Sequence, residues 1–547
     1  MNTLLTLHDP ARARAYHEAG LWTDDSFYAL AAAHARARPD GFALRDSARR
    51  LTWRALVARV DAYAERLAAA GVRRGDRVSL WMSNRAEAVV AFIACSRLGA
   101  VCNPSLHRNY TVAEIVGLLE RIDARAVLVE EGHGADTHRA DVFAAAARLT
   151  GLKLVERLPK ARAEVLPQRA QAALPPPVAG ADKICYLAFT SGTTGMPKGV
   201  MHADNTLLAN CRDLVRVWGL GPQSIVLSLS PLSHHIAWVG LGQAVTAGAE
   251  YVVDDPPAGK DRLDWIMESG ATYVLGVPTH AMDILAAQRK RGVARLGAVK
   301  VFYMAGAPIP PVVAEAFVAQ GITPQNVYGM SENSSHQFTH PTDDVATITR
   351  TCGRGGRAYE VKLFAQDDPD RAVPVGTVGE IGGRGACLML GYFSNQAATE
   401  RSFNREGWFM SGDLGVLDAK GNLAIVGRSK DLIIRGGHNI YPTRIEDIAV
   451  KHPQVTKAAC FGVPDERLGE KLCLAVTVQD GTGPGADDML RHLWQGGVSK
   501  LDMPEWYVEL PEFPLTASGK ILKRELVAQA SAGSIKPTPC RFVEPKE

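Results

Sequence analysis

A long, regular alternation of apolar strand-like runs and helical patterns, from Ile184 to Tyr328, most constrains how this chain can fold. Repeated strand–helix units predict a parallel sheet that is covered by helices on both faces. The strands are expected at residues 184–189, 225–230, 251–253, 272–275, 299–304 and 326–328. Such sheets bind their ligands at the carboxyl ends of the strands, so the functional loops are expected there.

The regions on either side of this alternation predict further units. Residues 51–129 also alternate between helix and strand, whereas short Gly-rich strands follow Pro341. We expect an α/β protein whose large N-terminal domain, residues 1–428, has layered, mainly parallel sheets with helices. It would include a small β-barrel-like subdomain at about residues 341–428. The mixed pattern beyond it predicts a small, mobile α+β domain at residues 429–547, and 547 residues are enough for several such cores.

Composition excludes several classes of protein. The 61 basic and 58 acidic residues nearly balance, whereas a nucleic-acid-binding chain would show a stronger basic excess. Nine cysteines without a C-x-x-C pair argue against a disulfide framework and a zinc site, and suit a reducing compartment. The longest obvious apolar run, residues 88–95, is far shorter than the ~20 residues that span a bilayer. We therefore expect a cytoplasmic protein without a transmembrane segment, and a homodimer is left open.

The sharpest local motif is TSGTTGMPKG at residues 190–199, which follows an apolar strand start. Backbone amides, small hydroxyls and a lysine on a strand-to-helix turn form a concavity suited to phosphate oxygens. The phosphate ligands expected here are Thr190, Ser191, Gly192, Thr193, Thr194 and Lys198. The segment is not a Walker A loop, because the pattern G-x-x-x-x-G-K-[ST] is not satisfied.

This loop resembles the signature of the acyl-adenylate-forming superfamily, which includes acyl- and aryl-CoA synthetases, peptide-synthetase adenylation domains and firefly-type luciferases. The resemblance extends over nearly the whole chain, because the other motifs follow in the family's order. It implies an AMP-forming acid–CoA ligase that first makes an acyl-AMP and pyrophosphate, and then an acyl-CoA and AMP. The cofactor implied is Mg²⁺, and the partners implied are ATP, coenzyme A and a small carboxylic acid.

Motifs after two successive strands complete the nucleotide site that the resemblance implies. AGAP at residues 305–308 leaves a flat slot, and the aromatic residue of YGMSE at 328–332 can stack on a purine. The resemblance assigns nucleotide contacts to Gly306, Ala307, Pro308, Asn326, Tyr328, Gly329, Ser331, Asp413 and Arg428. It assigns Mg²⁺ to Glu332, with Thr190 as a further candidate ligand.

The carboxyl-terminal motif PLTASGK, residues 514–520, places a lysine after a Gly-tipped loop. The resemblance makes Lys520 the catalytic lysine of adenylation, acting with Glu332 and Thr190, and makes Lys430 the hinge about which the small domain swings. Reversible acylation of Lys520 is a further hypothesis, which mass spectrometry of cell-derived protein would test.

Two further assignments concern coenzyme A and the acid. Residues 433–446, IIRGGHNIYPTRIE, resemble the CoA-ligase form of a family motif in which Gly436 and Gly437 line the route of the pantetheine arm. The acyl pocket is expected from His234, Ile236, Trp238, Val239, Gly240 and Met330, although His234 and Trp238 are as readily structural. The N-terminal stretch RARAYHEAGLW resembles bacterial short- and medium-chain fatty acid ligases and cyclohexanecarboxylate ligases. A short-chain, medium-chain or alicyclic/aromatic monocarboxylate is therefore the expected substrate.

Three alternatives stay open at the level of sequence. The first is an adenylating enzyme that loads a carrier protein, although the GGHNIYP variant favours free coenzyme A and no carrier domain follows on this chain. The second is a luciferase-like oxygenase, which oxygen consumption would reveal. The third is a non-catalytic nucleotide-binding protein, which would bind ATP without releasing pyrophosphate.

Overall fold

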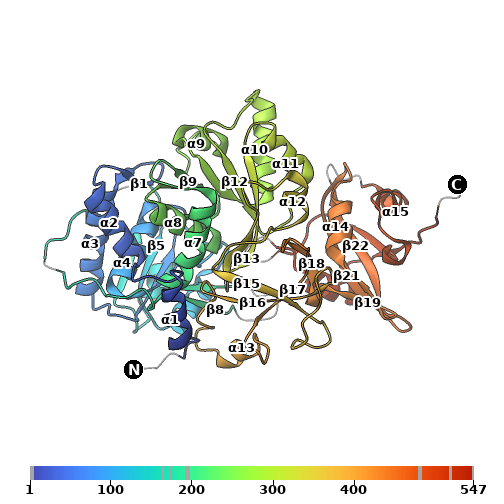
Figure 1. Ribbon diagram of the computed structural model, residues 1–547, viewed down its shortest axis with the longest axis horizontal. Helices are drawn as coiled ribbons and strands as arrows, with labels where there is room; N and C mark the ends of the chain where they lie inside the picture. The colour runs from blue at the N-terminus through green and yellow to red at the C-terminus, as the bar shows by residue number, and fades with distance from the viewer. Residues whose placement is uncertain are drawn as a thin grey trace.

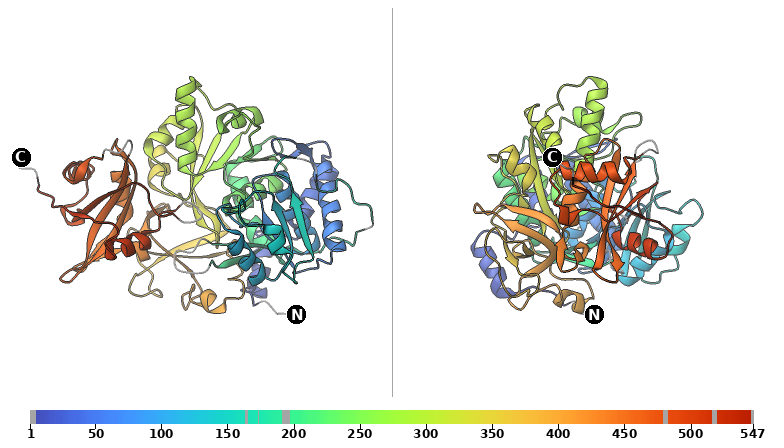
Figure 2. Two further views of the ribbon diagram at one scale, coloured as in Figure 1. Left: turned by 180° about the vertical axis from the view of Figure 1, so that it is seen from behind. Right: turned by 90° about the vertical axis from the view of Figure 1, so that its right-hand side faces the viewer.

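The computed structural model of the protein describes residues 5–162, 165–172, 174–190, 197–478, 483–515 and 520–544. Two large sheets and their helices form the body at one end, and a smaller unit formed by the last part of the chain stands at the other end (Figure 1). The same separation is visible from behind and from the side (Figure 2). Within the described residues no helix has both the length and the apolar character needed to cross a bilayer.

The first sheet has six strands in the order β6-β5-β3-β4-β7-β8, parallel except for the antiparallel pair β7–β8. Its strands are β3 (Arg77–Trp81), β4 (Val101–Asn103), β5 (Ala124–Glu130), β6 (Leu154–Leu158), β7 (Ile184–Phe189) and β8 (Gly199–Ala203). The helices of this part of the chain are α1 (Pro10–Glu18), α2 (Phe27–Ala37), α3 (Trp53–Ala69), α4 (Ala86–Leu98), α5 (Val112–Arg121) and α6 (Val142–Ala146).

The second sheet has eight strands in the order β14-β13-β12-β11-β9-β10-β1-β2, parallel from β13 to β1 and antiparallel at both edges. Its strands are β1 (Phe42–Arg45), β2 (Arg50–Thr52), β9 (Ile225–Ser228), β10 (Glu250–Val253), β11 (Tyr273–Gly276), β12 (Val301–Ala305), β13 (Thr323–Met330) and β14 (Ser334–Phe338). Helices α7 (Asp204–Trp218), α8 (His235–Ala247), α9 (Arg262–Ser269), α10 (Pro278–Arg291), α11 (Pro311–Val318) and α12 (Val345–Arg350) accompany it.

Two expectations about β7 prove wrong. The alternation predicted one parallel sheet from residue 184 onward, but β7 belongs to the first sheet and β9 to β13 belong to the second. The phosphate loop was expected to lead from a strand into a helix, but it leads into strand β8, which pairs back on β7. The apolar run at 199–203 is short enough to extend as a strand, and the helix begins only at Asp204, so the chain crosses between sheets through α7.

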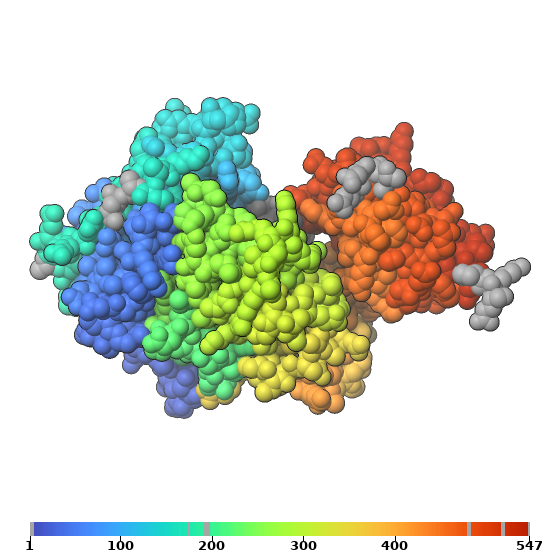
Figure 3. Space-filling view, turned by 90° about the horizontal axis from the view of Figure 1, so that it is seen from above, coloured from blue at the N-terminus to red at the C-terminus, as the bar shows by residue number. Residues whose placement is uncertain are grey.

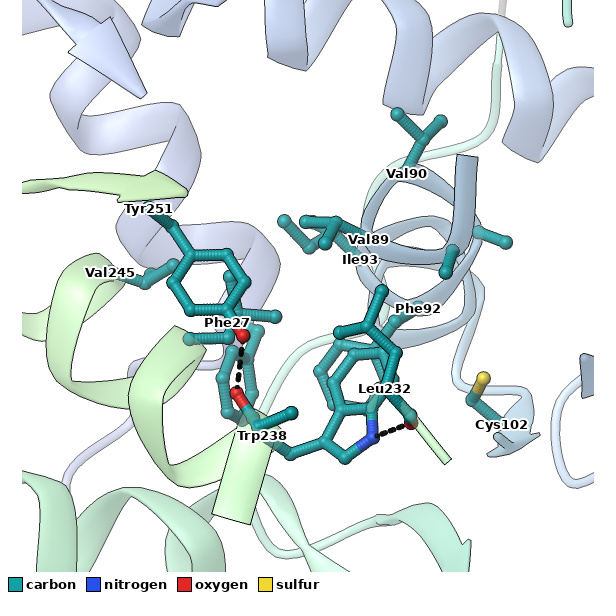
Figure 4. Close-up of a cluster of buried hydrophobic side chains, with 14 of the residues drawn as sticks. Phe27, Val89, Val90, Phe92, Ile93, Cys102, Leu232, Trp238, Val245 and Tyr251 are labelled. Atoms are coloured by element: carbon teal, nitrogen blue, oxygen red, sulfur yellow. Dashed lines mark hydrogen bonds between the residues drawn. The ribbon is translucent and has the colours of Figure 1, made fainter. Parts of the chain in front are cut away.

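One apolar core joins both sheets through helices α4, α7 and α8. Its centre is Trp238 of α8, which lies against Phe92 of α4 with ring centroids 4.5 Å apart (Figure 4). The buried polar atoms of the core are satisfied locally, because Trp238 Nε1 donates to Leu232 O at 2.7 Å and Tyr251 Oη donates to Ala237 O at 2.8 Å. The middle of helix α8 is therefore fixed in the core. The N-terminus of the same helix carries His234 and His235.

The region after Pro341 forms the small antiparallel β unit that was expected. Its four strands follow one another in sequence order, with β15 and β18 at the edges, so the unit is an open meander and the barrel-like closure was not correct. The elements are β15 (Tyr359–Phe364), β16 (Gly379–Gly385), α13 (Gln396–Glu400), β17 (Phe409–Leu417) and β18 (Leu423–Arg428).

The last part of the chain forms a mixed six-stranded sheet with helices, as the sequence predicted for an α+β unit. Its strands are β19 (Ile433–Arg435), β20 (His438–Ile440), β21 (Val455–Asp465), β22 (Gly469–Val478), β23 (Trp506–Leu510) and β24 (Thr538–Pro539). Its helices are η1 (Ser429–Asp431), α14 (Pro442–Ala449), α15 (Gly485–Gln495), η2 (Lys500–Asp502) and α16 (Lys523–Ser531). A hollow separates this unit from the body of the molecule (Figure 3).

Candidate active site

The predicted phosphate loop begins where β7 ends. Thr190 N–H donates to Lys198 O at 2.9 Å, so the two ends of the loop are joined and the hydroxyl and the ammonium group share one end of the first sheet. The four other predicted phosphate ligands, Ser191, Gly192, Thr193 and Thr194, lie outside the described residues.

Glu332 lies in the tight connection between β13 and β14 and is buried. One of its carboxylate oxygens accepts a hydrogen bond of 2.9 Å from Tyr392 Oη. Burial raises the pKa of Glu332, whereas the tyrosine bond and the charges of Lys198 and Lys520 act in the opposite direction. A buried carboxylate is stabilised by positive charge beside it, which Lys198, Lys520 or a phosphate-bound cation can supply.

The donor set fits Mg²⁺ with ATP. Within the described residues no group of three or more His, Cys, Asp or Glu side chains could hold a metal alone. Mg²⁺ is ordinarily bound by one or two carboxylates together with substrate phosphates, and it keeps several waters. Glu332 supplies the carboxylate, and Thr190 supplies a hydroxyl beside the phosphate loop.

The predicted adenine and ribose residues are brought together at the carboxyl ends of β12 and β13. Tyr328 Oη donates to Asp413 Oδ2 at 2.8 Å, and Arg428 Nε lies 3.3 Å from Asp413 Oδ1. Burial raises the pKa of Asp413, and Arg428 opposes that rise. Gly306, Ala307 and Pro308 are exposed beside them, and a Cβ on Gly306 would meet only one atom, at 3.9 Å. The backbone at this edge is therefore open to an approaching ligand.

Two of the residues predicted to bind the nucleotide, Asn326 and Gly329, also have structural roles. Asn326 is buried and its Nδ2 donates to Ile348 O at 2.8 Å and Thr351 O at 2.9 Å, so its amide nitrogen holds the end of α12. A Cβ on Gly329 would lie 1.7 Å from Ser334 O, so glycine is required there by the close β13–β14 crossing. The nearby Ser331 is half-buried, and its carbonyl accepts a hydrogen bond from His202.

Lys520 reaches this site from the C-terminal unit. Its charge acts on Glu332, Asp413 and His234, all of which belong to the body of the molecule. Solvent still reaches the Lys520 side chain, but desolvation by the surrounding protein lowers the pKa of its ammonium group, and Arg428 adds to that effect. The structure therefore shows the C-terminal unit with Lys520 near the residues predicted to bind ATP.

The predicted hinge residue and the two predicted CoA residues are close together in sequence, but they lie in different elements. Lys430 is the middle residue of η1, the short helix between β18 and β19. Gly436 and Gly437 form the β19–β20 turn with φ values of 57° and 85°, which favour glycine. Gly436 N–H donates to Leu468 O at 2.7 Å, so this turn is attached to the C-terminal sheet.

The six residues predicted for the acyl pocket lie in two different surroundings. His234, Ile236 and Met330 keep partial exposure at the N-terminus of α8 and at the end of β13, beside the residues above. Trp238, Val239 and Gly240 instead lie in the core. Trp238 and Val239 are 1% and 2% exposed, and a Cβ on Gly240 would meet Tyr251 at 3.2 Å. Helical periodicity turns these three inward once α8 packs between the sheets, so we withdraw them from the pocket.

Two family models match this chain. Residues 31–393 match the family of AMP-binding enzymes, and residues 444–520 match the C-terminal domain of AMP-binding enzymes. This chain is an AMP-binding enzyme. The medium-chain fatty-acid–CoA ligase of Escherichia coli is 30% identical to it over 96% of this chain and 93% of that protein. A feruloyl-CoA synthase of Amycolatopsis is 33% identical over 90% of this chain and 96% of that protein.

A solved structure supports the same family. The o-succinylbenzoate–CoA synthetase of Bacillus subtilis, in complex with ATP and magnesium, superposes on this AMP-binding enzyme with a TM-score of 0.79. The two chains are 25% identical, and the match covers 92% of this chain and 100% of that chain.

Sequence reasoning missed several polar residues of this AMP-binding enzyme. His235 bonds Ser334 Oγ at 3.0 Å and Tyr186 Oη at 3.3 Å, and it stacks on His202 with centroids 5.6 Å apart. His202 Nε2 lies 2.6 Å from Ser331 O, so two imidazoles support the loop that carries Ser331 and Glu332. The doubled histidine in PLSHHI was the available signal, whereas nothing near His202 in the sequence marked it.

Burial keeps an unusual number of imidazoles neutral. Desolvation is the main cause, and it lowers the pKa to about 3 in His107, His235 and His336 and to about 4 in His202, His234 and His280. An unfolded histidine has a pKa near 6.5, so between about pH 4 and 6.5 the unfolded chain binds more protons than the folded protein. Folding stability therefore falls as the pH is lowered through this window.

We expect the melting temperature of this AMP-binding enzyme to fall steeply between pH 7 and pH 5. His336 is 1% exposed, and within the described part of the chain neither ring nitrogen has a hydrogen-bond partner. His336→Phe keeps a ring against Tyr359 but removes the titration, so its melting temperature is expected to fall less. Scanning fluorimetry at pH 5, 6 and 7 measures this, with the exposed His138→Gln as control. Equal pH dependence in the wild type and His336→Phe would contradict it.

Proposed function

We propose that this AMP-binding enzyme is an AMP-forming acid–CoA ligase. One observation carries the proposal: Lys520 comes from the C-terminal unit close enough to interact electrostatically with Glu332 and with the Asp413–Arg428 pair of the body. A nucleotide-binding protein without chemistry needs no lysine delivered from a second unit. The relatives named as CoA ligases, which match over nearly the full chain, support the same conclusion.

The first step is attack of a carboxylate on the α-phosphorus of ATP, with pyrophosphate as leaving group. Both reactants are anions, and two unit charges 4 Å apart repel by about 4 kcal/mol at an effective dielectric constant of 20. In the proposed mechanism Lys198 contacts the leaving phosphates, and Lys520 bridges the carboxylate and the α-phosphate. Lys520 therefore stabilises charge where the bond forms.

In this proposal, different residues bind the metal and the nucleotide. When bound, Mg²⁺ neutralises phosphate charge, and Glu332 and Thr190 would hold it. Asp413 accepts hydrogen bonds from the ribose hydroxyls, with Arg428 beside it to reach ribose or phosphate. Tyr328 and the open edge at Gly306 hold the adenine.

The second step is attack of the CoA thiol on the acyl-adenylate, with AMP as leaving group. This step needs a narrow route for the pantetheine arm, and glycine lets a backbone approach such an arm closely. We assign the route to Gly436 and Gly437, which reach the site when the C-terminal unit turns about Lys430. The short η1 connection supports a pivot there.

We propose a medium-chain or aromatic monocarboxylate as substrate. Ile236 and Met330 offer apolar surface beside the site, and the neighbouring imidazole of His234 is neutral near pH 7, since burial lowers its pKa to about 4. A neutral, partly apolar wall suits an uncharged acyl group better than a second carboxylate. A cytoplasmic location and a homodimer remain predictions.

The decisive experiment offers purified enzyme a panel of linear, alicyclic and aromatic acids. We expect acid-dependent exchange of labelled pyrophosphate into ATP and CoA-dependent release of AMP for at least one class. Pyrophosphate exchange without turnover of free CoA, but with transfer to a phosphopantetheinyl carrier protein, would favour the carrier-loading alternative. Absence of exchange with every acid would refute the proposal.

A further inference from the structure

A segment that no motif above includes connects the phosphate loop to Glu332. Residues 389–393, here called the crossing segment, run between β8 and the connection that carries Glu332. Its backbone bonds are Met389 N to Glu332 O at 2.7 Å, Leu390 N to Met201 O at 2.7 Å, Met201 N to Gly391 O at 3.0 Å and Phe393 N to Gly199 O at 2.7 Å. Because β8 begins directly after the phosphate loop, this segment fixes the loop's exit strand relative to Glu332.

The side chain of Tyr392 makes the same link within the site. Tyr392 is 5% exposed, and its Oη donates to Glu332 Oε1 at 2.9 Å. Its ring lies under Lys198, whose Nζ is 4.5 Å from the ring centroid. A phenol with an ordinary pKa of about 10 is protonated at neutral pH, and an ionised carboxylate can only accept, so the hydroxyl is the donor in this bond. One side chain therefore touches both the proposed magnesium carboxylate and the proposed phosphate lysine.

We infer that Tyr392 is a positioning residue for magnesium–ATP: its hydroxyl orients the Glu332 carboxylate toward the metal, and its ring holds Lys198 over the phosphates. This inference rests on the proposed function, in which Glu332 holds Mg²⁺. A cation–π contact and a hydrogen bond from one rigid ring fix the distance between a carboxylate and an ammonium group that would otherwise pair with each other.

The expected size of the mutational effect follows from the coordination geometry that Mg²⁺ requires. Mg²⁺ requires near-ideal octahedral geometry at 2.0–2.1 Å, so a small rotation of a carboxylate weakens its bond. Loss of a hydrogen-bonding partner behind a ligand typically costs 10–100-fold in metal affinity or activity. Tyr392→Phe removes the hydroxyl but keeps the ring under Lys198, whereas Tyr392→Leu removes both.

The test uses the full-length enzyme and two readouts. Binding of Mn²⁺ to the enzyme with a non-hydrolysable ATP analogue is measured by electron paramagnetic resonance. The Mg²⁺ concentration that half-saturates pyrophosphate exchange is measured separately. For Tyr392→Phe we expect about 10-fold weaker Mn²⁺ binding and a matching rise in half-saturating Mg²⁺, with much of the rate recovered at high Mg²⁺. For Tyr392→Leu we expect an additional rise in the KM for ATP.

The matched control is Tyr359→Phe. Tyr359 is also buried, and its hydroxyl accepts a hydrogen bond of 3.3 Å from Asn333, the residue next to Glu332. This variant is expected to lose a tyrosine hydroxyl that contacts the same loop from β15, without changing Mn²⁺ binding.

Two results would overturn the inference. The first is wild-type Mn²⁺ binding by Tyr392→Phe with a correctly folded melting profile. The second is an equal loss in Tyr359→Phe, which would mean that general packing accounts for the effect. If the wild type itself showed no acid-dependent exchange, the proposed function would fail, yet the Mn²⁺ comparison would still decide whether Tyr392 orients the carboxylate.

Discussion

Lys520→Ala is expected to reduce acyl-adenylate formation by at least about 100-fold while preformed acyl-AMP is still converted to acyl-CoA. Removing one group that stabilises developing charge in a water-poor site typically costs 10²–10³ in rate. The ammonium group interacts electrostatically with Glu332 and Asp413 in this structure, so its loss is expected to affect the step in which phosphate and carboxylate meet. Pyrophosphate exchange measures the first half-reaction, and thioester formation from synthetic acyl-AMP measures the second.

Lys457→Ala is a suitable control for this variant, because Lys457 is an exposed lysine on β21 of the same unit. It is expected to leave both half-reactions near the wild-type rate. If Lys520→Ala slowed both half-reactions equally, the assignment of the lysine to a single pose of the C-terminal unit would be wrong.

Gly437→Asn is expected to have the opposite effect: pyrophosphate exchange continues, but thioester formation falls by at least about 10-fold. A side chain in the β19–β20 turn narrows the proposed pantetheine route, and a misplaced reactant commonly costs that much or more. Asparagine is chosen because it tolerates the left-handed conformation that φ of 85° requires, and a Cβ there meets no atom within 4 Å. Loss of the second step would therefore report on the bound CoA rather than on local unfolding.

Gly533→Asn matches this change elsewhere in the same unit, since Gly533 has φ of 71° and equally open surroundings. Both half-reactions are expected to survive it. Normal thioester formation by Gly437→Asn would remove the turn from the proposed CoA route.

Much of the architecture was predictable because its signals are local. Short apolar runs bounded by turn residues located β7 and β9 to β13, but they did not reveal β1, β2, β4, β6, β8 or β14. The partition of those strands between two sheets was not predictable. It depends on whether the chain after β7 pairs back as β8 or crosses to another layer, and this choice is made by tertiary packing.

The residues of the candidate site also fall into those that local sequence signals predicted and those that depend on tertiary packing. Asp413 and Arg428, read from separate motifs, meet each other and Tyr328 in the structure, because strand pairing places Asp413 opposite Arg428. Tyr392 and His202 contact Glu332 and Ser331, which are far away in the sequence, and neither residue belongs to a motif that marked it. Trp238 was misplaced for the converse reason, since an aromatic residue near a motif has the same sequence signature whether it faces a ligand or the core.

The connection at Ser429–Asp431 has a consequence for how often the two parts of the molecule meet. It joins strands β18 and β19 directly, and β18 ends at Arg428, which pairs with Asp413 in the proposed ribose site. If the C-terminal unit swings as proposed, so short a tether keeps the Lys520 ammonium group at a local concentration of about a millimolar or more around the nucleotide, whatever the amount of enzyme in the cell. Each encounter is therefore an internal rotation whose rate does not depend on dilution.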